Sequence, residues 1–362
     1  MKRTLISFAV LGTILAAAGA QAGGWDRSGQ DTSIILKEGS LLEITAVTVA
    51  PTITGTYLGT NLATGGVAPD YSFTNLAFRA EINDGLSIAV IQDEPFGASV
   101  DWKNGTGAYS TVNAKISSDA TTVLVGYDLD NVTIYGGIKN QTFGASANLP
   151  LSAAASYAIT STPDTSLGYV IGAAIEKPEI AMRVALTYHT KITHDVAIVE
   201  TITTAGGAST SSSILTADTP SSFNLDFQTG VAENTLLFGT IRSVKWTQTA
   251  LNPTVFVATA NKPLKEFTSN TVSYSVGLGR KFSDHWSGAV TYGNESAEGT
   301  AGSALAPTDG YSKMGVGVTY SGENADITLG VQQINNGDTP APAATMSDNT
   351  TLVTAVKIAY NF

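Results

Sequence analysis

The sequence has no cysteine and few charged residues. Without cysteine there is no disulfide framework, no thiolate nucleophile and no Cys-ligated zinc or iron–sulfur site. Charged residues make up 14% of the 362 residues, well below the ~25% of an ordinary soluble domain. The 19 Lys and Arg against 30 Asp and Glu give a formal charge of −11. This balance argues against a nucleic-acid partner, because phosphate binding needs clustered Lys and Arg.

Enzymatic and cofactor motifs are also missing. The histidines are His189, His194 and His285, and none belongs to an H-E-x-x-H motif. No G-x-S-x-G nucleophile motif, phosphate-binding loop or cofactor-binding motif is present. We therefore expect no metal, no cofactor and no enzymatic activity.

The first residues have the three parts of a secretory signal peptide. Lys2 and Arg3 form a positive region, residues 5–18 are apolar, and Ala20-Gln21-Ala22 matches an A-x-A cleavage site. We predict that residues 1–22 are a signal peptide. Beyond them no run approaches the ~18 consecutive apolar residues of a membrane-spanning helix. The protein is expected to be exported.

Apolar residues recur with a period of two along most of the chain. Met182–Tyr188 and Val272–Leu278 each place apolar side chains on one face and small or polar side chains on the other. This alternation predicts β-strands. A soluble β-sandwich would show the same alternation, with its apolar face inward.

The connections between these runs fall into two kinds. Six tight polar turns are centred on Asn83-Asp84-Gly85, Leu129-Asp130-Asn131, Lys177-Pro178-Glu179, Ala232-Glu233-Asn234, Ser283-Asp284-His285 and Gly322-Glu323-Asn324. Seven longer connections rich in Gly, Ser, Thr, Ala and Pro fall at 56–69, 103–109, 144–165, 201–219, 250–266, 298–309 and 336–349. Six tight turns and seven longer connections that alternate along the chain join fourteen strands. This alternation is typical of a transmembrane antiparallel β-barrel, with short turns on one side and long loops on the other.

The last residues agree with this fold class. Val356–Phe362 places Val, Ile, Tyr and the terminal Phe362 on one face. This ending resembles the signal that the barrel-assembly machinery of Gram-negative outer membranes recognises, so that machinery is an expected partner. The alternative is an edge strand of a secreted β-domain. We predict an all-β transmembrane barrel over residues 41–362, since a closed even-stranded barrel leaves no backbone unpaired in lipid.

Several segments resemble the FadL-type family of long-chain fatty-acid and hydrocarbon transporters. They are Phe73–Arg79, Gly85–Ile88 leading into Gln92–Ala98, Asn234–Phe238, Arg242–Trp246, and Trp25–Gln30 followed by Glu38-Gly39. The resemblance implies a barrel closed by an amino-terminal hatch. It also implies an inward kink in the third strand, through which hydrophobic substrate passes sideways into the membrane.

The predicted third strand, residues 86–102, contains a matching interruption. Asp93, Glu94, Pro95, Phe96 and Gly97 place two carboxylates and a proline where a lipid-facing strand should continue. Proline cannot donate to the ladder, and glycine permits a bulge. We predict that these five residues form a lateral gate. The alternative is that the strand simply leaves the bilayer here, with its carboxylates among the headgroups.

The hatch would comprise residues 23–40. Trp25, Asp26, Arg27 and Gln30 are expected to fill the lumen by bonding to wall residues. The segment is short and lacks the Asn-Pro-Ala signature common in the family. The alternative is an untethered exported tail.

A fatty acid would need a cation or donors for its carboxylate, because a bare buried carboxylate is costly. Alternation places such groups on the polar faces of the seventh and ninth strands, so we predict substrate binding by Arg183, His189, Lys191, Arg242 and Trp246. The alternative is that luminal charges pair with one another or with water. The loops at 144–165 and 201–219 would offer hydrophobic capture.

The predicted function is passive transport of hydrophobic compounds across the outer membrane of a Gram-negative bacterium. We expect a monomer surrounded by outer-membrane lipid and lipopolysaccharide. The main alternative is a water-filled diffusion porin for small hydrophilic solutes. A structural or adhesive barrel, or a hydrolase whose triad assembles from distant residues, would be further alternatives.

Overall fold

The computed structural model describes residues 24–59, 61–102, 109, 111–299, 303–341 and 344–362. The predicted signal peptide, residues 1–22, lies outside the described residues, and so do residues 103–108 of one predicted loop. No helix in the described part of the chain is long and apolar enough to cross a membrane.

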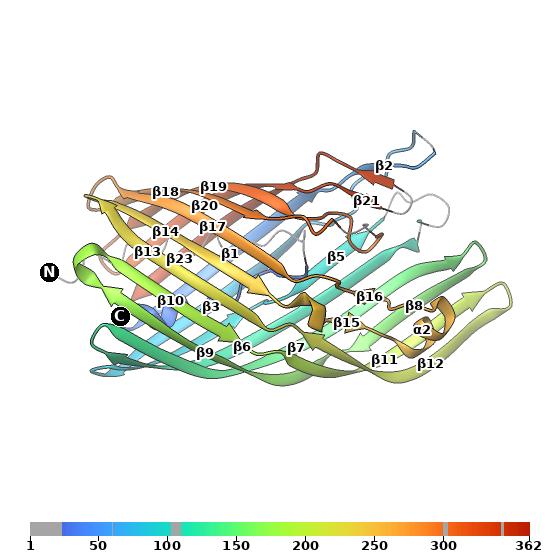
Figure 1. Ribbon diagram of the computed structural model, residues 1–362, viewed down its shortest axis with the longest axis horizontal. Coiled ribbons are helices and arrows are strands. Elements are labelled where there is room, and N and C mark those ends of the chain that lie inside the picture. The colour runs from blue at the N-terminus through green and yellow to red at the C-terminus, as the bar shows by residue number, and fades with distance from the viewer. Residues whose placement is uncertain (1–23, 60, 103–108, 110, 300–302, 342–343) are drawn as a thin grey trace.

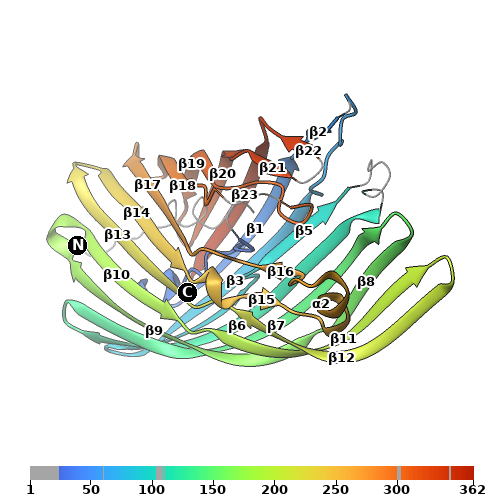
Figure 2. The same cartoon turned by 45° about the vertical axis from the view of Figure 1, so that its right-hand side comes forward.

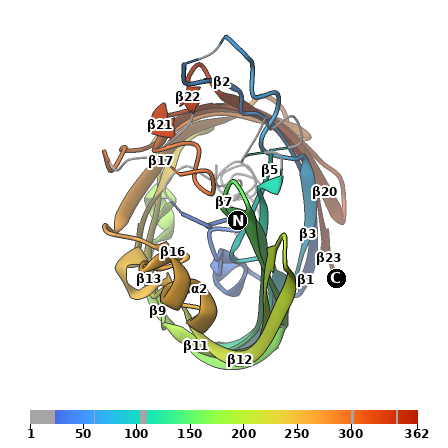
Figure 3. The same ribbon diagram turned by 90° about the vertical axis from the view of Figure 1, so that its right-hand side faces the viewer.

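The strands form one closed antiparallel barrel. β1 pairs with β3 on one side and with β23 on the other, from Leu41 opposite Asn361 to Thr52 opposite Thr350. The wall therefore encircles a lumen, as Figure 3 shows along the barrel axis. β4 with β5, β8 with β9, β10 with β11, and β12 with β13 are each one interrupted wall strand. So counted, the described residues form fourteen wall strands, which confirms the predicted fold class. The wall comprises β1 (Leu41–Thr52), β3 (Tyr71–Asn83), β4 (Leu86–Asp93), β5 (Gly97–Asp101), β6 (Asn113–Leu129), β7 (Val132–Ser152), β8 (Ala155–Thr162), β9 (Asp164–Lys177), β10 (Met182–His189), β11 (Ile192–Thr204), β12 (Gly207–Thr219), β13 (Ser222–Ala232), β14 (Thr235–Val244), β17 (Thr271–Lys281), β18 (Trp286–Glu295), β19 (Tyr311–Ser321), β20 (Ala325–Asn336) and β23 (Thr350–Asn361).

The two ends of the barrel differ in their connections (Figure 1). All six predicted tight turns lie at one end, called the turn end, together with the start of β1 and the end of β23. The longer connections lie at the opposite end, called the loop end. The remaining elements are η1 (Ser33–Leu36), η3 (Pro178–Ile180), η4 (Trp246–Gln248), α2 (Thr254–Ala260), β2 (Gly55–Tyr57), β15 (Ala250–Leu251), β16 (Lys265–Glu266), β21 (Thr339–Ala341) and β22 (Ala344–Met346).

The apolar face of the wall points outward. Along β23, Leu352, Val356 and Ile358 are exposed, whereas Thr351 and Lys357, on the opposite face, are buried in the lumen. Outward-facing Val, Ile, Leu and aromatic residues repeat in this way around the wall. A soluble sandwich buries its apolar face, so this inverted arrangement removes that alternative and fits a surface in contact with lipid.

Two predicted loops are wrong. The regions 144–165 and 201–219 are mostly strands, because β7 continues to Ser152 and turns into β8, and β11 turns into β12 after Thr204. Figure 2 shows both hairpins extending from the loop end. Their Ser, Thr and Ala content suggested loops, but β-branched Thr suits a pleated strand. Alternation also persists inside them, since Tyr157 and Ile159 both point inward and are buried.

One loop-end connection folds back over the mouth of the barrel. The residues between β14 and β17 form η4, β15, α2 and β16, and α2 lies beside β11 and β12 (Figure 3). Glu200 of β11 holds it there. Its carboxylate accepts bonds from the Tyr157 hydroxyl at 2.9 Å and from the backbone N–H groups of Val255 and Phe256 at 3.1 and 3.0 Å. The connection thereby becomes a fixed part of the mouth.

The strand register predicts that two neighbouring substitutions in the middle of β17 destabilise the barrel to very different extents. Val276 faces outward and Ser275 faces the lumen. Val276→Arg should cost about 2–4 kcal/mol of folding free energy in a bilayer, because it places a charge in hydrocarbon. Ser275→Arg, the matched control, should cost much less. Reversible urea unfolding in lipid vesicles measures both values, and the reverse order would mean that the register is displaced by one residue.

Candidate functional site

The amino-terminal segment, residues 24–40, lies inside the lumen and is called the hatch. Trp25, Ser28, Gln30 and Ile35 are all buried, and η1 packs against β3, β4 and β6. The chain reverses at Gly29 and Gln30, whose φ angles of 65° and 55° are left-handed. The untethered-tail alternative is therefore wrong for these residues, and the predicted hatch inside the lumen is confirmed.

Arg242 of β14 holds the first half of the hatch. Its guanidinium donates to both carboxylate oxygens of Asp26, from Nε at 2.5 Å and from Nη2 at 3.0 Å. It also donates to Gln30 Oε1 at 3.1 Å and to Asn224 Oδ1 at 2.7 Å. Such a bidentate, charge-assisted contact fixes orientation as well as position.

A second set of charges holds the other half at the turn end. Arg79 and Arg183 donate to backbone carbonyls of residues 35–39, the latter at 2.9 Å. Glu43 of β1 pairs with Lys37 of the hatch and, at 2.9 Å, with Lys357 of β23. Burial lowers the pKa of Lys37 to about 8, opposed by the Glu43 carboxylate, so the ammonium stays mostly protonated at neutral pH.

The third wall strand is broken beside the hatch. β4 pairs with β3 as well as with β6, but it ends at Asp93. β5 resumes at Gly97 and pairs with β6, and no pairing among the described residues joins β5 to β3. The edge of β3 from Tyr71 to Asn75 is thus without a strand neighbour on this side. This interval between β3 and β5 is called the wall gap.

The backbone of the broken segment is satisfied by the hatch instead. Arg27 N–H donates to the Pro95 carbonyl at 3.0 Å, and Gly97 N–H donates to the Trp25 carbonyl at 2.6 Å. The Ser28 hydroxyl adds a side-chain bond to Asp93 Oδ2 at 2.5 Å. The predicted interruption is therefore a real break in the wall, and it lies against the hatch.

A cavity of about 310 Å³ lies on the loop-end side of the hatch and is called the outer cavity. It reaches the wall gap, since Tyr71 of β3 and Ala98 and Val100 of β5 line it. Trp25 and Phe267 line it, and Trp246 packs against both, with ring centroids 4.9–6.3 Å apart; these three rings are called the aromatic floor. A smaller apolar cavity of about 40 Å³ adjoins it and shares Trp25, Ala98, Val100, Leu264, Lys265 and Leu305.

Lys265 is the cation at this junction. Its ammonium lies 4.3 Å from the ring centroid of Phe267, and the side chain lines both cavities. Burial lowers the pKa of Lys265, whereas the carboxylates of Glu298 and Glu266 raise it. The outer cavity therefore combines apolar residues such as Val100, Leu264 and Leu305 with Lys265 and three carboxylates, those of Glu266, Glu298 and Asp309.

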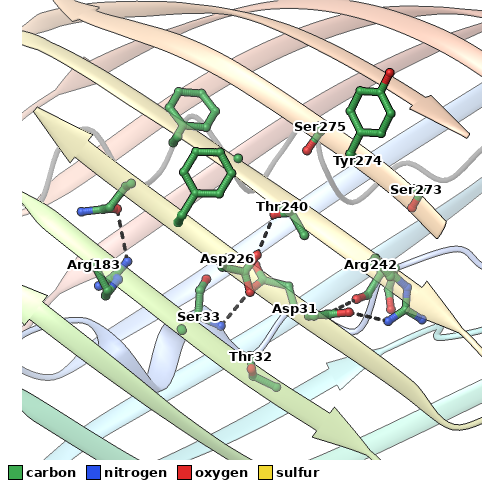
Figure 4. A pocket seen from close by; sticks show the side chains of 18 of the residues that line it. Asp31, Thr32, Ser33, Arg183, Asp226, Thr240, Arg242, Ser273, Tyr274 and Ser275 are labelled. Atoms are coloured by element: carbon green, nitrogen blue, oxygen red, sulfur yellow. Dashed lines mark hydrogen bonds between the residues drawn. The ribbon is translucent and has the colours of Figure 1, made fainter. Parts of the chain in front are cut away.

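A second cavity, of about 120 Å³, lies beside the hatch toward the turn end and is called the lower cavity. Figure 4 shows its labelled side chains, which include Asp31 from the hatch, Arg183 from β10, Asp226 from β13 and Arg242 from β14. Asp226 accepts a bond from the Thr240 hydroxyl at 2.6 Å. The lower cavity, like the outer one, therefore has charges of both signs in its lining.

The hatch lies between the two cavities, and two consecutive residues of it face different cavities. Trp25 lines the outer cavity and Asp26 lines the lower one. An apolar compound that reaches Trp25 from the loop end therefore meets the aromatic floor ahead and the wall gap to one side.

The residues predicted to bind substrate are dispersed. Arg183 and Arg242 bond the hatch, and His189 is buried, with Nδ1 3.2 Å from the Lys139 ammonium. Lys191 lies past the end of β10, is 42% exposed and pairs with Asp218. Trp246 belongs to the aromatic floor and donates to the Thr271 hydroxyl at 3.1 Å. Trp246 packs against two residues that line the outer cavity, and Arg183, Lys191 and Arg242 each pair with a carboxylate of the protein. Substrate binding by these five residues stays a prediction.

Two parts of the site escaped the sequence analysis. Lys265 lies in the connection between β14 and β17, where the mixed composition predicts no more than a loop. The Lys37–Glu43–Lys357 group joins residues from both ends of the chain, so no local pattern could reveal it.

These features define a class: a fourteen-stranded barrel with an internal amino-terminal hatch and a broken third strand. No family model matches this chain, and no curated protein matches its sequence. Solved structures do match it. A FadL homologue of Pseudomonas aeruginosa superposes with a TM-score of 0.78 at 15% identity, covering 97% of this chain and 98% of that one.

Two further structures are similar over nearly the whole chain. The toluene transporter TbuX of Ralstonia pickettii has a TM-score of 0.67 at 12% identity, with 97% and 98% covered. The toluene transporter TodX of P. putida has a TM-score of 0.67 at 10% identity, with 91% and 92% covered. At such identities the likeness shows the fold, and the predicted FadL-type fold is confirmed.

The anchor at Arg242 generates a prediction about hatch order. Arg242→Ala should raise amide hydrogen exchange at Arg27 and Ser28 roughly thirtyfold, because a part-buried bidentate ion pair is worth about 2 kcal/mol. Arg183→Ala, the control, removes a luminal arginine that holds only the far end of the hatch. It should leave these two amides near their wild-type rates. Equal rates in both variants would show that Arg242 does not anchor this half.

Proposed function

We propose that this protein is a passive channel for hydrophobic compounds in the outer membrane of a Gram-negative bacterium. Substrate is captured in the outer cavity and released sideways through the wall gap into the bilayer. The observation that carries this proposal is the shape of the path: the outer cavity reaches both flanks of the wall gap, and the hatch lies between it and the lower cavity.

The similar solved structures also support transport of a hydrophobic compound. TbuX and TodX are described as toluene transporters, and a further similar structure, CymD, as a monoaromatic hydrocarbon channel. Their sequences are too distant to transfer a substrate. The shared fold, together with the smaller apolar cavity and the apolar side chains at the wall gap, favours a hydrophobic compound over a hydrophilic one.

The energetics of the path need no coupling to an energy source. Each CH₂ group that leaves water for the bilayer gains about 0.8 kcal/mol. The wall gap supplies a passage around the polar lipopolysaccharide leaflet. The five residues from Asp93 to Gly97 act as the lateral gate, with the hatch as its inner cover.

Recognition of Phe362 by the assembly machinery is also part of the proposal. The Phe362 ring packs on Phe78 and Tyr360.

Closing the wall gap tests the release path. We would replace Asp93–Gly97 by five residues of alternating Thr and Val, which let the third strand continue and pair with β3. Cells without their own transporter should then lose uptake of labelled toluene and of labelled long-chain fatty acid. The unmodified protein is the reference, and heat-modifiable gel mobility verifies that the variant barrel is folded.

Two results would contradict the proposal. Undiminished uptake by the closed-wall variant would show that release does not use the wall gap. Permeability of the unmodified protein to small sugars, with no uptake of either hydrophobic compound, would identify a diffusion porin.

A further inference from the structure

Arg27 spans the wall gap from the inside. Its backbone belongs to the hatch, and its guanidinium contacts both flanks of the gap. Nη1 donates to Glu94 Oε2 at 2.8 Å on the broken strand, and the guanidinium carbon lies 4.2 Å from the ring centroid of Tyr71 on β3. Ion pairing on one side and cation–π attraction on the other thus hold the gap closed.

Gly97 is the residue that lets Arg27 reach this position. A Cβ atom at Gly97 would lie 2.5 Å from the guanidinium carbon of Arg27. No larger residue fits there without pushing the arginine aside. The first residue of β5 and the side chain of the hatch are therefore matched to each other.

The guanidinium has more donors than its partners accept. The Arg27 side chain is 7% exposed, and its Nε has no acceptor among the described residues. A buried donor without an acceptor is costly, so this position favours a ligand that supplies another oxygen. Glu94, with a side chain 27% exposed, offers Arg27 one oxygen only.

We propose that Arg27 is the specificity-determining residue of the wall gap, and that an incoming carboxylate opens the gap by replacing Glu94 on the guanidinium. This inference rests on the proposed sideways release. The ligand is an amphiphile with a carboxylate headgroup and an apolar tail. Its class follows from the present occupant of Arg27, which is itself a carboxylate.

The exchange keeps Arg27 paired at every stage. Withdrawing the arginine without a replacement would leave a buried charge uncompensated, which is strongly unfavourable. A carboxylate that bridges Nε and a terminal nitrogen makes the bidentate contact that Glu94 does not make. The displaced Glu94 is partly exposed and can be hydrated. A neutral compound with the same tail has no charge to exchange, so its exit must wait until the arginine withdraws on its own and is slower.

The experiment compares two probes of equal chain length, labelled hexadecanoate and labelled hexadecanol. Uptake is measured in cells that lack their own transporter. The wild type should favour the carboxylate about tenfold, the effect of one charge-assisted hydrogen bond. Arg27→Gln should bring the ratio close to one, because alcohol uptake rises. Glu94→Gln should raise carboxylate uptake, since the competitor for Arg27 is gone.

Gly97→Ala is the matched variant that keeps every charge. It displaces the Arg27 side chain and should lower the ratio as Arg27→Gln does. Unchanged ratios in Arg27→Gln and Gly97→Ala would overturn the inference. So would loss of both probes in a folded Arg27→Gln barrel, which would make the arginine only a support of the hatch. Failure of the wild type to take up either probe would contradict the proposed transport itself.

Discussion

The pairing between the hatch and the broken third strand is the interaction on which the rest of the structure depends. A break in a barrel wall exposes backbone N–H and C=O groups that must find partners. Here the hatch supplies partners for part of the break: Arg27 and Ser28 N–H donate to the Pro95 and Glu94 carbonyls, and Gly97 N–H donates to the Trp25 carbonyl. Because that partner is a short segment inside the lumen and not a wall strand, the break is covered although the third strand is not continuous. Arg79, Arg183 and Arg242 hold that segment in place.

The hatch divides the lumen into two cavities. Arg242 and the Glu43 group hold its two halves. Trp25 of the hatch lines the outer cavity, and the next residue, Asp26, lines the lower one. Both cavities have charged residues in their lining, but the outer cavity meets the flanks of the wall gap at Tyr71, Ala98 and Val100. A compound that partitions into the outer cavity therefore contacts aromatic and aliphatic side chains at the wall gap.

Much of the fold could be predicted because barrel walls are repetitive. Period-two alternation and six tight turns fixed the strand number, and Pro95 marked the break. The long hairpins at β7–β8 and β11–β12 were missed because Ser and Thr occur in loops and strands alike. The site was harder, since which luminal charges meet depends on contacts across many residues. Arg242 was correctly placed in the lumen, but its partner Asp26 is 216 residues away and no local pattern pairs them.

The most direct test of this account is to lock the hatch onto the break. Asp26 and Phe96 face each other in the bridge between the two segments, a pairing whose spacing suits a disulfide, and the chain has no cysteine of its own. In an Asp26→Cys/Phe96→Cys variant, oxidised and reduced forms of the same protein are compared for uptake of a labelled hydrophobic compound. The account predicts that the oxidised form is blocked and that a reductant restores uptake. Equal uptake by both forms would contradict it.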